Sequence, residues 1–210
     1  MRSDNTTTPF NLILFDLGGV IIELSGVQQM LDWSKDIPSE KDLWHRWLSS
    51  RAVRDFESGQ STPDHFAHAM IAEFKLSVTP ELFLDAFIQW TRGLYAGADA
   101  LLQSLSHHFS LGILSNTNEL HWHRFETEMN FLHHFDYTYP SHLTGRLKPD
   151  RETFRYVAEA SGYLPGQILF FDDNPQNTDS AKSTGIEAYT VSGASEVWQK
   201  LTELNLIVRE

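Results

Sequence analysis

A short run of apolar residues near the amino terminus ends at a carboxylate. Leu12–Phe15 is apolar at every position, Asp16 follows it directly, and Gly18 and Gly19 come two residues later. A continuously apolar strand is typical of a parallel sheet, where both faces of the strand are buried. Paired glycines let the backbone approach a ligand closely, and an acid at this end of a parallel strand lies where open α/β sheets bind ligands. Taken alone, Asp16 is more often a turn or cap residue, so the later segments decide its role.

Between about residues 26 and 95 the apolar residues recur at helical spacing instead. The turn at residues 59–63 and Thr79-Pro80 interrupt this pattern, and each places a threonine cap ahead of a first-turn proline. We predict four helices packed as a small bundle. The residues before them, Val20–Leu24, indicate a short extended flap.

From Ala98 onward, apolar strands alternate with helical segments. The predicted strands lie at residues 111–114, near Tyr137, and at 168–171 and 187–191. The predicted helices cover residues 98–107, 118–129, 148–161 and 175–183, and a last helix ends the chain. This alternation favours a parallel sheet with right-handed crossovers. We therefore predict an α/β fold with a doubly wound, Rossmann-like core (residues 10–25 and 96–210) and a helical cap (26–95) inserted after the first strand.

The amino-acid composition excludes several kinds of binding partner and site. The 210 residues, 41% of them hydrophobic, suffice for a packed core and a smaller lobe. A formal net charge of −12 argues against a nucleic-acid partner, and the absence of cysteine excludes disulfides and thiolate sites. The first apolar run is too short for a signal sequence or a membrane span. We expect a cytoplasmic protein, a monomer or weak dimer, without membrane partners.

Polar side chains follow the later core segments as well. Ser115 and Asn116 end the second core strand, Lys148 opens a helix, and Asp172 and Asp173 end the most apolar strand. Because the carboxyl ends of parallel strands share one edge, these groups can meet the aspartate of the first strand. Crowded carboxylates attract Mg²⁺, and a hydroxyl, an amide and an ammonium group can hold a phosphate. One carboxylate can then attack phosphorus.

These segments resemble a known set of motifs. Asp16–Val20, Leu114–Asn116, Lys148-Pro149 and Phe171–Asn174 are similar, in this order, to the four motifs of the haloacid dehalogenase superfamily. The resemblance covers essentially the whole chain, and the helical insert resembles the small cap of that superfamily. Within it, the sequence is most similar to bacterial α-glucose-1-phosphate phosphatases and to the amino-terminal phosphatase domain of soluble epoxide hydrolase.

The resemblance implies a role for each matched acidic residue. Asp16 would attack phosphorus to form an aspartyl-phosphate, and would bind Mg²⁺ together with Asp173 and the backbone carbonyl of Gly18. Asp172 would be a further metal ligand, or would lie behind the ligands and contact them without binding the metal itself.

The remaining matched residues would act on the phosphate. Ser115 and Asn116 would bind the phosphoryl oxygens, and Lys148 would neutralise charge on the nucleophile and the phosphate. The resemblance implies a Mg²⁺-dependent hydrolase of phosphoric monoesters whose substrate is a small phosphorylated metabolite. A sugar phosphate, above all a sugar 1-phosphate, is favoured.

Gly18 departs from the family pattern, which usually has an aspartate there as general acid and base. Such a loss typically costs roughly 10²–10⁴-fold in rate. Three explanations are open. The leaving group is an anomeric hydroxyl, which is acidic enough to leave without a proton, or a cap or flap residue such as Glu23 or His45 supplies the proton. In the third, the protein is a slow or inactive relative that is retained for binding. A dehalogenase, attacking carbon with Asp16, is a further alternative, although it needs neither a metal nor a later acidic pair.

The insert also offers residues that could face a substrate. We expect its tryptophans mainly to pack. In the alternative, some of them line the substrate side of the cap together with Arg51, Arg54 or Glu57.

Overall fold

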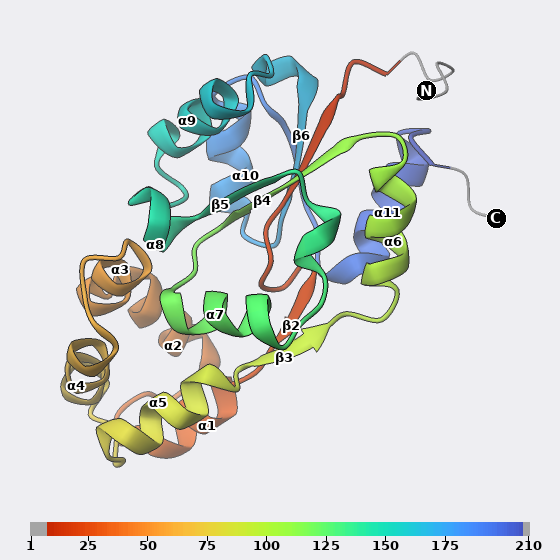
Figure 1. The fold of residues 1–210 in the computed structure, drawn as a ribbon. Coiled ribbons are helices and arrows are strands. Elements are labelled where there is room, and N and C mark those ends of the chain that lie inside the picture. Colours follow the sequence, from red (N-terminus) through yellow and green to blue (C-terminus); the bar gives the residue numbers. More distant parts are fainter. Residues whose placement is uncertain (1–7, 208–210) are drawn as a thin grey trace.

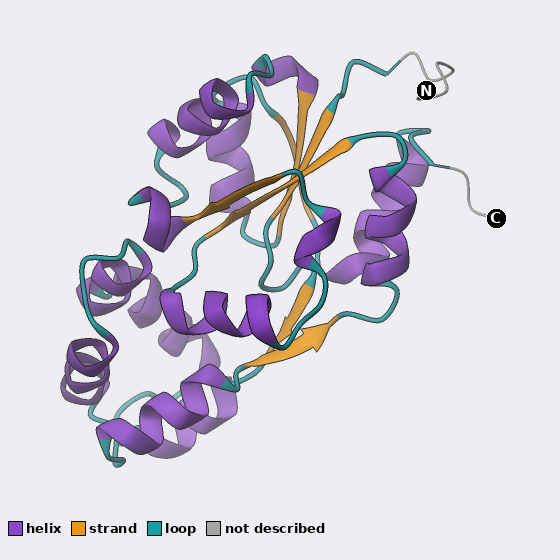
Figure 2. Cartoon of the chain, in the orientation of Figure 1, coloured by secondary structure: helices purple, strands orange, loops and turns teal. Residues whose placement is uncertain are grey.

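The computed structural model describes residues 8–207 and is built around a five-stranded parallel sheet (Figures 1 and 2). The strand order is β5-β4-β1-β6-β7. The strands are β1 (Leu12–Phe15), β4 (Ser110–Ser115), β5 (Tyr137–Pro140), β6 (Ile168–Asp172) and β7 (Glu187–Thr190). All four pairings are parallel. The predicted α/β, Rossmann-like fold is therefore confirmed.

Helices cover both faces of this sheet (Figure 1). They are α6 (Ala98–Ser106), α7 (Glu119–Thr127), α9 (Arg151–Ser161), α10 (Pro175–Lys182) and α11 (Gly193–Glu203), with short turns at α8 (Ser141–Thr144), η1 (Leu132–His134) and η2 (Pro165–Gln167). Alternate side chains of β1 lie on opposite faces of the sheet. Ile13 and Phe15 pack in the cluster that includes α6 and α11, whereas Leu12 and Leu14 pack with α9 and α10. No helix in the described part of the chain is long and apolar enough to span a membrane.

The insert after β1 has its own aromatic core. Its helices are α1 (Val27–Trp33), α2 (Glu40–Ser49), α3 (Arg51–Glu57), α4 (Pro63–Phe74) and α5 (Pro80–Ile88). Phe56 and Phe66 stack at 4.2 Å between ring centroids, within a cluster that also buries Phe83 and Phe87. The prediction of four helices was wrong, because Ser50 divides the second one: its side chain accepts a hydrogen bond from the Val53 amide at 3.2 Å and so caps a new helix.

A two-stranded antiparallel ribbon joins the insert to the sheet domain. The predicted flap is strand β2 (Ile22–Leu24), and it pairs with β3 (Thr91–Leu94), which the sequence pattern did not predict. Because β2 and β3 lie on opposite sides of the boundary drawn from the sequence, the division into a core and a cap at residues 26–95 stays a proposal.

Helix α7 contacts α5 of the insert through His121. Its Nε2 lies 2.7 Å from the Phe87 carbonyl oxygen, and its Nδ1 lies 3.2 Å from the side-chain amide of Asn118. The rings of His121 and Phe87 stack at 4.3 Å. Burial lowers the pKa of His121 to about 4. The neutral ring therefore donates from Nε2 to Phe87 and accepts from Asn118 at Nδ1.

This contact predicts a pH-dependent contribution to stability. As the pH falls from 6.5 towards 4, the unfolded chain binds a proton on His121 that the folded chain excludes, so the free energy of unfolding falls. We expect a smaller loss over this range in His121→Gln, measured by urea denaturation at a series of pH values. His107→Gln, at the exposed end of α6, is the control. If the free energy of unfolding of His121→Gln fell with pH as steeply as that of the wild type, the neutral, buried state assigned to His121 would be contradicted.

Candidate active site

The carboxyl ends of β1 and β6 bring three aspartates together. The parallel register places Phe15 beside Phe171, so Asp16 and Asp172, which follow them, are neighbours. One carboxylate oxygen from each of Asp16, Asp172 and Asp173 lies within 4.8 Å of the other two. Asp172 is fully buried and Asp16 is 9% exposed, whereas Asp173 lies at the surface of the cluster. The three carboxylates expected at this edge of the sheet are therefore in contact range of one cation.

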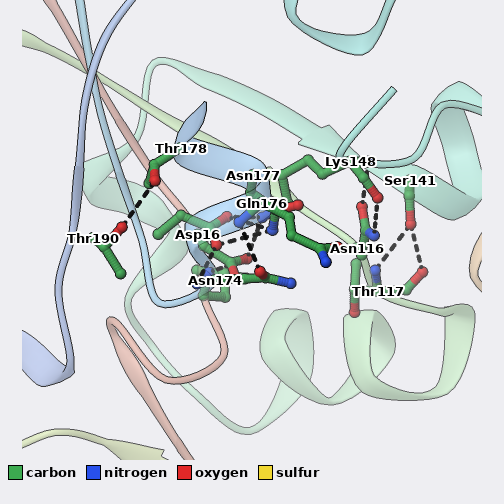
Figure 3. Close-up of polar contacts among 12 residues, drawn as sticks. Asp16, Asn116, Thr117, Ser141, Lys148, Asn174, Gln176, Asn177, Thr178 and Thr190 are labelled. Atoms are coloured by element: carbon green, nitrogen blue, oxygen red, sulfur yellow. Dashed lines mark hydrogen bonds and ion pairs between the residues drawn. The ribbon is translucent and has the colours of Figure 1, made fainter. Parts of the chain in front are cut away.

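Lys148 completes the cluster with a buried ammonium group (Figure 3). Its Nζ lies 3.0 Å from Oδ1 of Asp16 and 2.6 Å from Oδ2 of Asp172. Although burial opposes its charge, the two carboxylates raise the pKa of Lys148. The backbone of Lys148 is fixed by Asn116, which donates to its carbonyl oxygen and accepts from its amide, both at 2.9 Å. The loop that carries the lysine is thus held against the end of β4.

The two oxygens of Asp172 are occupied by protein groups. Besides the Lys148 ammonium, they accept from the side-chain amide of Asn177 at 2.9 and 3.0 Å, and Oδ1 accepts from the Asn174 amide at 2.8 Å. In Asp16, Oδ1 accepts from Leu17 and Lys148, while Oδ2 has no hydrogen-bond partner among the described residues. Asp172 is therefore suited to orient the lysine, and Asp16 has an oxygen available for chemistry.

The electrostatics of the cluster fit a divalent cation. Burial raises the pKa of Asp16 to about 7; Asp172 and Asp173 add to this rise, and the charge of Lys148 opposes it. Partial burial and the charge of Asp172 raise the pKa of Asp173 to about 6. Carboxylates crowded in this way are stabilised in their charged forms by a cation, and oxygen ligands are those that Mg²⁺ prefers. A Cβ atom on Gly19 would lie 2.3 Å from Oδ2 of Asp173, so the glycine leaves room for this carboxylate.

A hydrogen-bonded link joins the phosphate-binding candidates to the insert. Ser115 ends β4 as a buried residue and Asn116 follows it. The next amide, of Thr117, donates to Oγ of Ser141 at 2.9 Å (Figure 3). The same Oγ lies 2.5 Å from the carbonyl oxygen of Glu57, the last residue of α3. Glu57 is thereby fixed relative to the loop after β4.

A cavity of about 140 Å³ lies between this loop and the insert. Gly18, Ser115 and Asn116 line it from the side of the sheet. Its other walls are mostly apolar and include Leu24, Val27, Met30, Leu43, Trp44 and Trp47. Glu57 is the single Asp, Glu, Lys or Arg side chain that lines the cavity in the described part of the chain. Burial, with a contribution from the charge of Asp16, raises the pKa of Glu57 to about 7.

Of the cap residues proposed to face a substrate, some line the cavity and others do not. Glu57 lines the cavity, and so do the tryptophans Trp44, Trp47 and Trp90, which were expected mainly to pack. Arg51 and Arg54 do not line it; they form exposed ion pairs with Asp55 and Asp150. Neither Glu23 nor His45, the proton donors suggested from the sequence, lines the cavity, and both are exposed.

Sequence reasoning missed two residues that organise the site. Asn177 lies five residues after Asp172, in the first turn of α10, and could have been found from its place at the start of that helix. Ser141 follows β5 and connects to Glu57 across a long stretch of sequence, so no local pattern indicates it.

Comparison with known proteins agrees with this geometry. Residues 10–185 match the sequence model of the haloacid dehalogenase-like hydrolases. The chain belongs to this family. The predicted membership of the haloacid dehalogenase superfamily is thus confirmed, and the protein is a hydrolase.

Several relatives are similar over nearly the whole chain. A haloacid dehalogenase family enzyme from Bacteroides thetaiotaomicron, solved in complex with magnesium and inorganic phosphate, is 25% identical, with a TM-score of 0.74 over 91% of this chain and 98% of its own. A predicted hydrolase of the same family from Porphyromonas gingivalis is 26% identical, with a TM-score of 0.76 over 96% of this chain and 100% of its own. Phosphatase MT3486 of Mycobacterium tuberculosis is 23% identical over 86% of this chain and 89% of its own.

The carboxylate cluster predicts that Mg²⁺ stabilises the fold. Saturating Mg²⁺ should raise the melting temperature, since a ligand at 100 times its Kd adds about 2.7 kcal/mol. In Asp173→Asn we expect a higher melting temperature without metal, because one repelling charge is gone, and a much smaller shift on adding Mg²⁺. Asp179→Asn, exposed on α10, is the control. An undiminished Mg²⁺ shift in Asp173→Asn would contradict the metal site.

Proposed function

We propose that the protein is a Mg²⁺-dependent phosphatase that hydrolyses a small phosphorylated metabolite through an aspartyl-phosphate on Asp16. The observation that carries this proposal is the buried Lys148 ammonium, 3.0 Å from Asp16 and 2.6 Å from Asp172, at the edge where the carboxylates meet. Phosphoryl transfer depends mainly on positioning and electrostatic stabilisation, which this arrangement supplies. The magnesium and phosphate bound by the Bacteroides relative and the name of the Mycobacterium relative support the same reaction.

The first step forms a bond between Asp16 Oδ2 and phosphorus and breaks the bond from phosphorus to the leaving oxygen. Ser115 and Asn116 bind the phosphoryl oxygens, and Lys148 offsets the negative charge that gathers between nucleophile and phosphate. Water then attacks phosphorus, the bond to Asp16 breaks, and inorganic phosphate leaves.

Mg²⁺, when bound, supplies positive charge beside the phosphoryl oxygens. Asp16, Asp173 and the carbonyl of Gly18 would hold it, and Asp172 would keep Lys148 in place. A dehalogenase has no use for the second pair of carboxylates, so the acidic cluster favours the phosphatase over that alternative.

The nucleophile assignment predicts the effect of a single substitution. Asp16→Asn should lower phosphate release by at least about 10³-fold with Mg²⁺ present, because the amide is a poor nucleophile. Activity of the wild type should also disappear in EDTA. The measurement is phosphate release from a panel of sugar, nucleoside and acyl phosphates, with folding checked by circular dichroism. Asp85→Asn, exposed on α5, should keep wild-type activity; near-wild-type release by Asp16→Asn would refute the assignment.

The cavity walls bear on the organic part of the substrate. Two hydroxyl groups that line it are already hydrogen-bonded inside the protein: Ser25 Oγ donates to the Trp90 carbonyl at 3.2 Å, and Thr91 Oγ1 donates to the Ile88 carbonyl at 3.4 Å. The hydroxyls of a sugar would find few partners there, and unpaired buried hydroxyls are costly. The sugar 1-phosphate implied by the family resemblance stays a prediction, and the walls support a compact apolar group instead. A cavity of roughly 150 Å³ in another protein holds benzene.

A comparison of two phosphate esters distinguishes an apolar substrate from a sugar phosphate. Cyclohexylmethyl phosphate and glucose 6-phosphate are both esters of primary alcohols that carry a six-membered ring. We expect kcat/KM for cyclohexylmethyl phosphate to exceed that for glucose 6-phosphate by roughly tenfold or more, because only the sugar must bury hydroxyls without partners. Trp44→Gln should remove most of this preference, whereas Leu48→Gln, an exposed residue of the same helix outside the cavity, should leave it unchanged. Glucose 6-phosphate as the better substrate would contradict the apolar assignment.

A further inference from the structure

Gly18 leaves the proposed reaction without its usual proton donor. An alkyl alcohol is a poor leaving group unless its oxygen is protonated, and a positioned general acid contributes roughly 10²–10⁴-fold. A Cβ atom at Gly18 would lie 2.7 Å from Cδ1 of Leu24, so the space beside residue 18 is filled by an apolar side chain. A donor must therefore come from another wall of the cavity.

Glu57 is placed for this task by geometry. It lines the same cavity as Gly18, Ser115 and Asn116, from the end of helix α3 in the insert. Its carboxylate makes no hydrogen bond or ion pair with any other residue that the structure describes. Its main chain is nonetheless fixed, because Ser141 links its carbonyl to the amide of Thr117, directly after Asn116. Glu57 thus combines a fixed backbone with an unengaged carboxyl group, and it lines the cavity together with the phosphate-binding loop.

We propose that Glu57, from the cap, is the general acid and base of the reaction. This inference rests on the proposed phosphatase function. As the bond from phosphorus to the leaving oxygen breaks, the Glu57 carboxyl gives its proton to that oxygen, and the alcohol departs. The Glu57 carboxylate then takes a proton from the water that attacks the aspartyl-phosphate. Phosphate is released, and Glu57 is protonated again for the next turnover.

The electrostatic setting of Glu57 agrees with this role. Burial, with the charge of Asp16 adding to it and that of Lys148 opposing it, holds its pKa at about 7. A general acid and base works best when its pKa is close to the working pH. Glu23 and His45 are exposed and lie outside the cavity. His121 does line the cavity, but burial keeps its ring neutral, and both ring nitrogens are hydrogen-bonded, to Phe87 and Asn118.

The test compares two leaving groups in Glu57→Gln. Single-turnover release of the alcohol or phenol isolates the first step, and Mg²⁺ is present throughout. We expect Glu57→Gln to slow release of cyclohexylmethanol from its phosphate by roughly 10²–10⁴-fold. Release of 4-nitrophenolate from its phosphate should fall by less than about tenfold, since this ion leaves without a proton. Retained 4-nitrophenolate release also shows that the variant is folded.

Glu23→Gln and His45→Gln are the matched controls and should release both leaving groups at the wild-type rate. If the wild type releases 4-nitrophenolate but Glu57→Gln slows both leaving groups equally, or neither, the role of Glu57 is refuted and the phosphatase stands. If the wild type releases no leaving group from either ester, both the phosphatase and the role of Glu57 are refuted.

Discussion

A buried lysine between two aspartates is the interaction on which the site depends. Burying the Lys148 ammonium is tolerable only because Asp16 and Asp172 lie within 3.0 and 2.6 Å of it. Asp16 directly follows β1, Asp172 ends β6, and Lys148 lies in the loop before α9, so their ion pairs hold distant segments at one edge of the sheet. Asn116 and Asn177 fix the lysine backbone and the second carboxylate. The same interactions thus hold the fold at this edge and place the charges that phosphoryl transfer requires.

The cavity and its single carboxylate are best understood together. Its apolar walls favour an organic group with few hydroxyls, and the alcohol of such an ester needs a proton to leave. A carboxyl group among apolar walls is itself desolvated, which raises the pKa of Glu57 to about 7. The apolar walls that select the substrate therefore also allow Glu57 to carry its proton near neutral pH. Gly18 is then no defect, because the acid comes from the insert.

Sequence patterns could predict the parts of this molecule that depend on local chemistry. Continuous apolar runs marked the core strands, and the parallel topology then implied that Asp16 and Asp172 meet at one edge. The break between α2 and α3 was missed because a serine at residue 50 is compatible with either a continuous helix or a cap. Choosing Glu57 over Glu23 was beyond the sequence, since it depends on how the insert docks through Ser141.

The most direct test of the central claim is to trap the covalent intermediate. Wild-type protein would be quenched in acid during turnover of a phosphate ester with Mg²⁺, reduced with borohydride, digested and analysed by mass spectrometry. An acyl phosphate is reduced to an alcohol, so an aspartyl-phosphate at position 16 becomes homoserine. We predict homoserine at position 16, and only in samples quenched during turnover. Unmodified aspartate at position 16, with homoserine at another aspartate, would contradict Asp16 as the nucleophile.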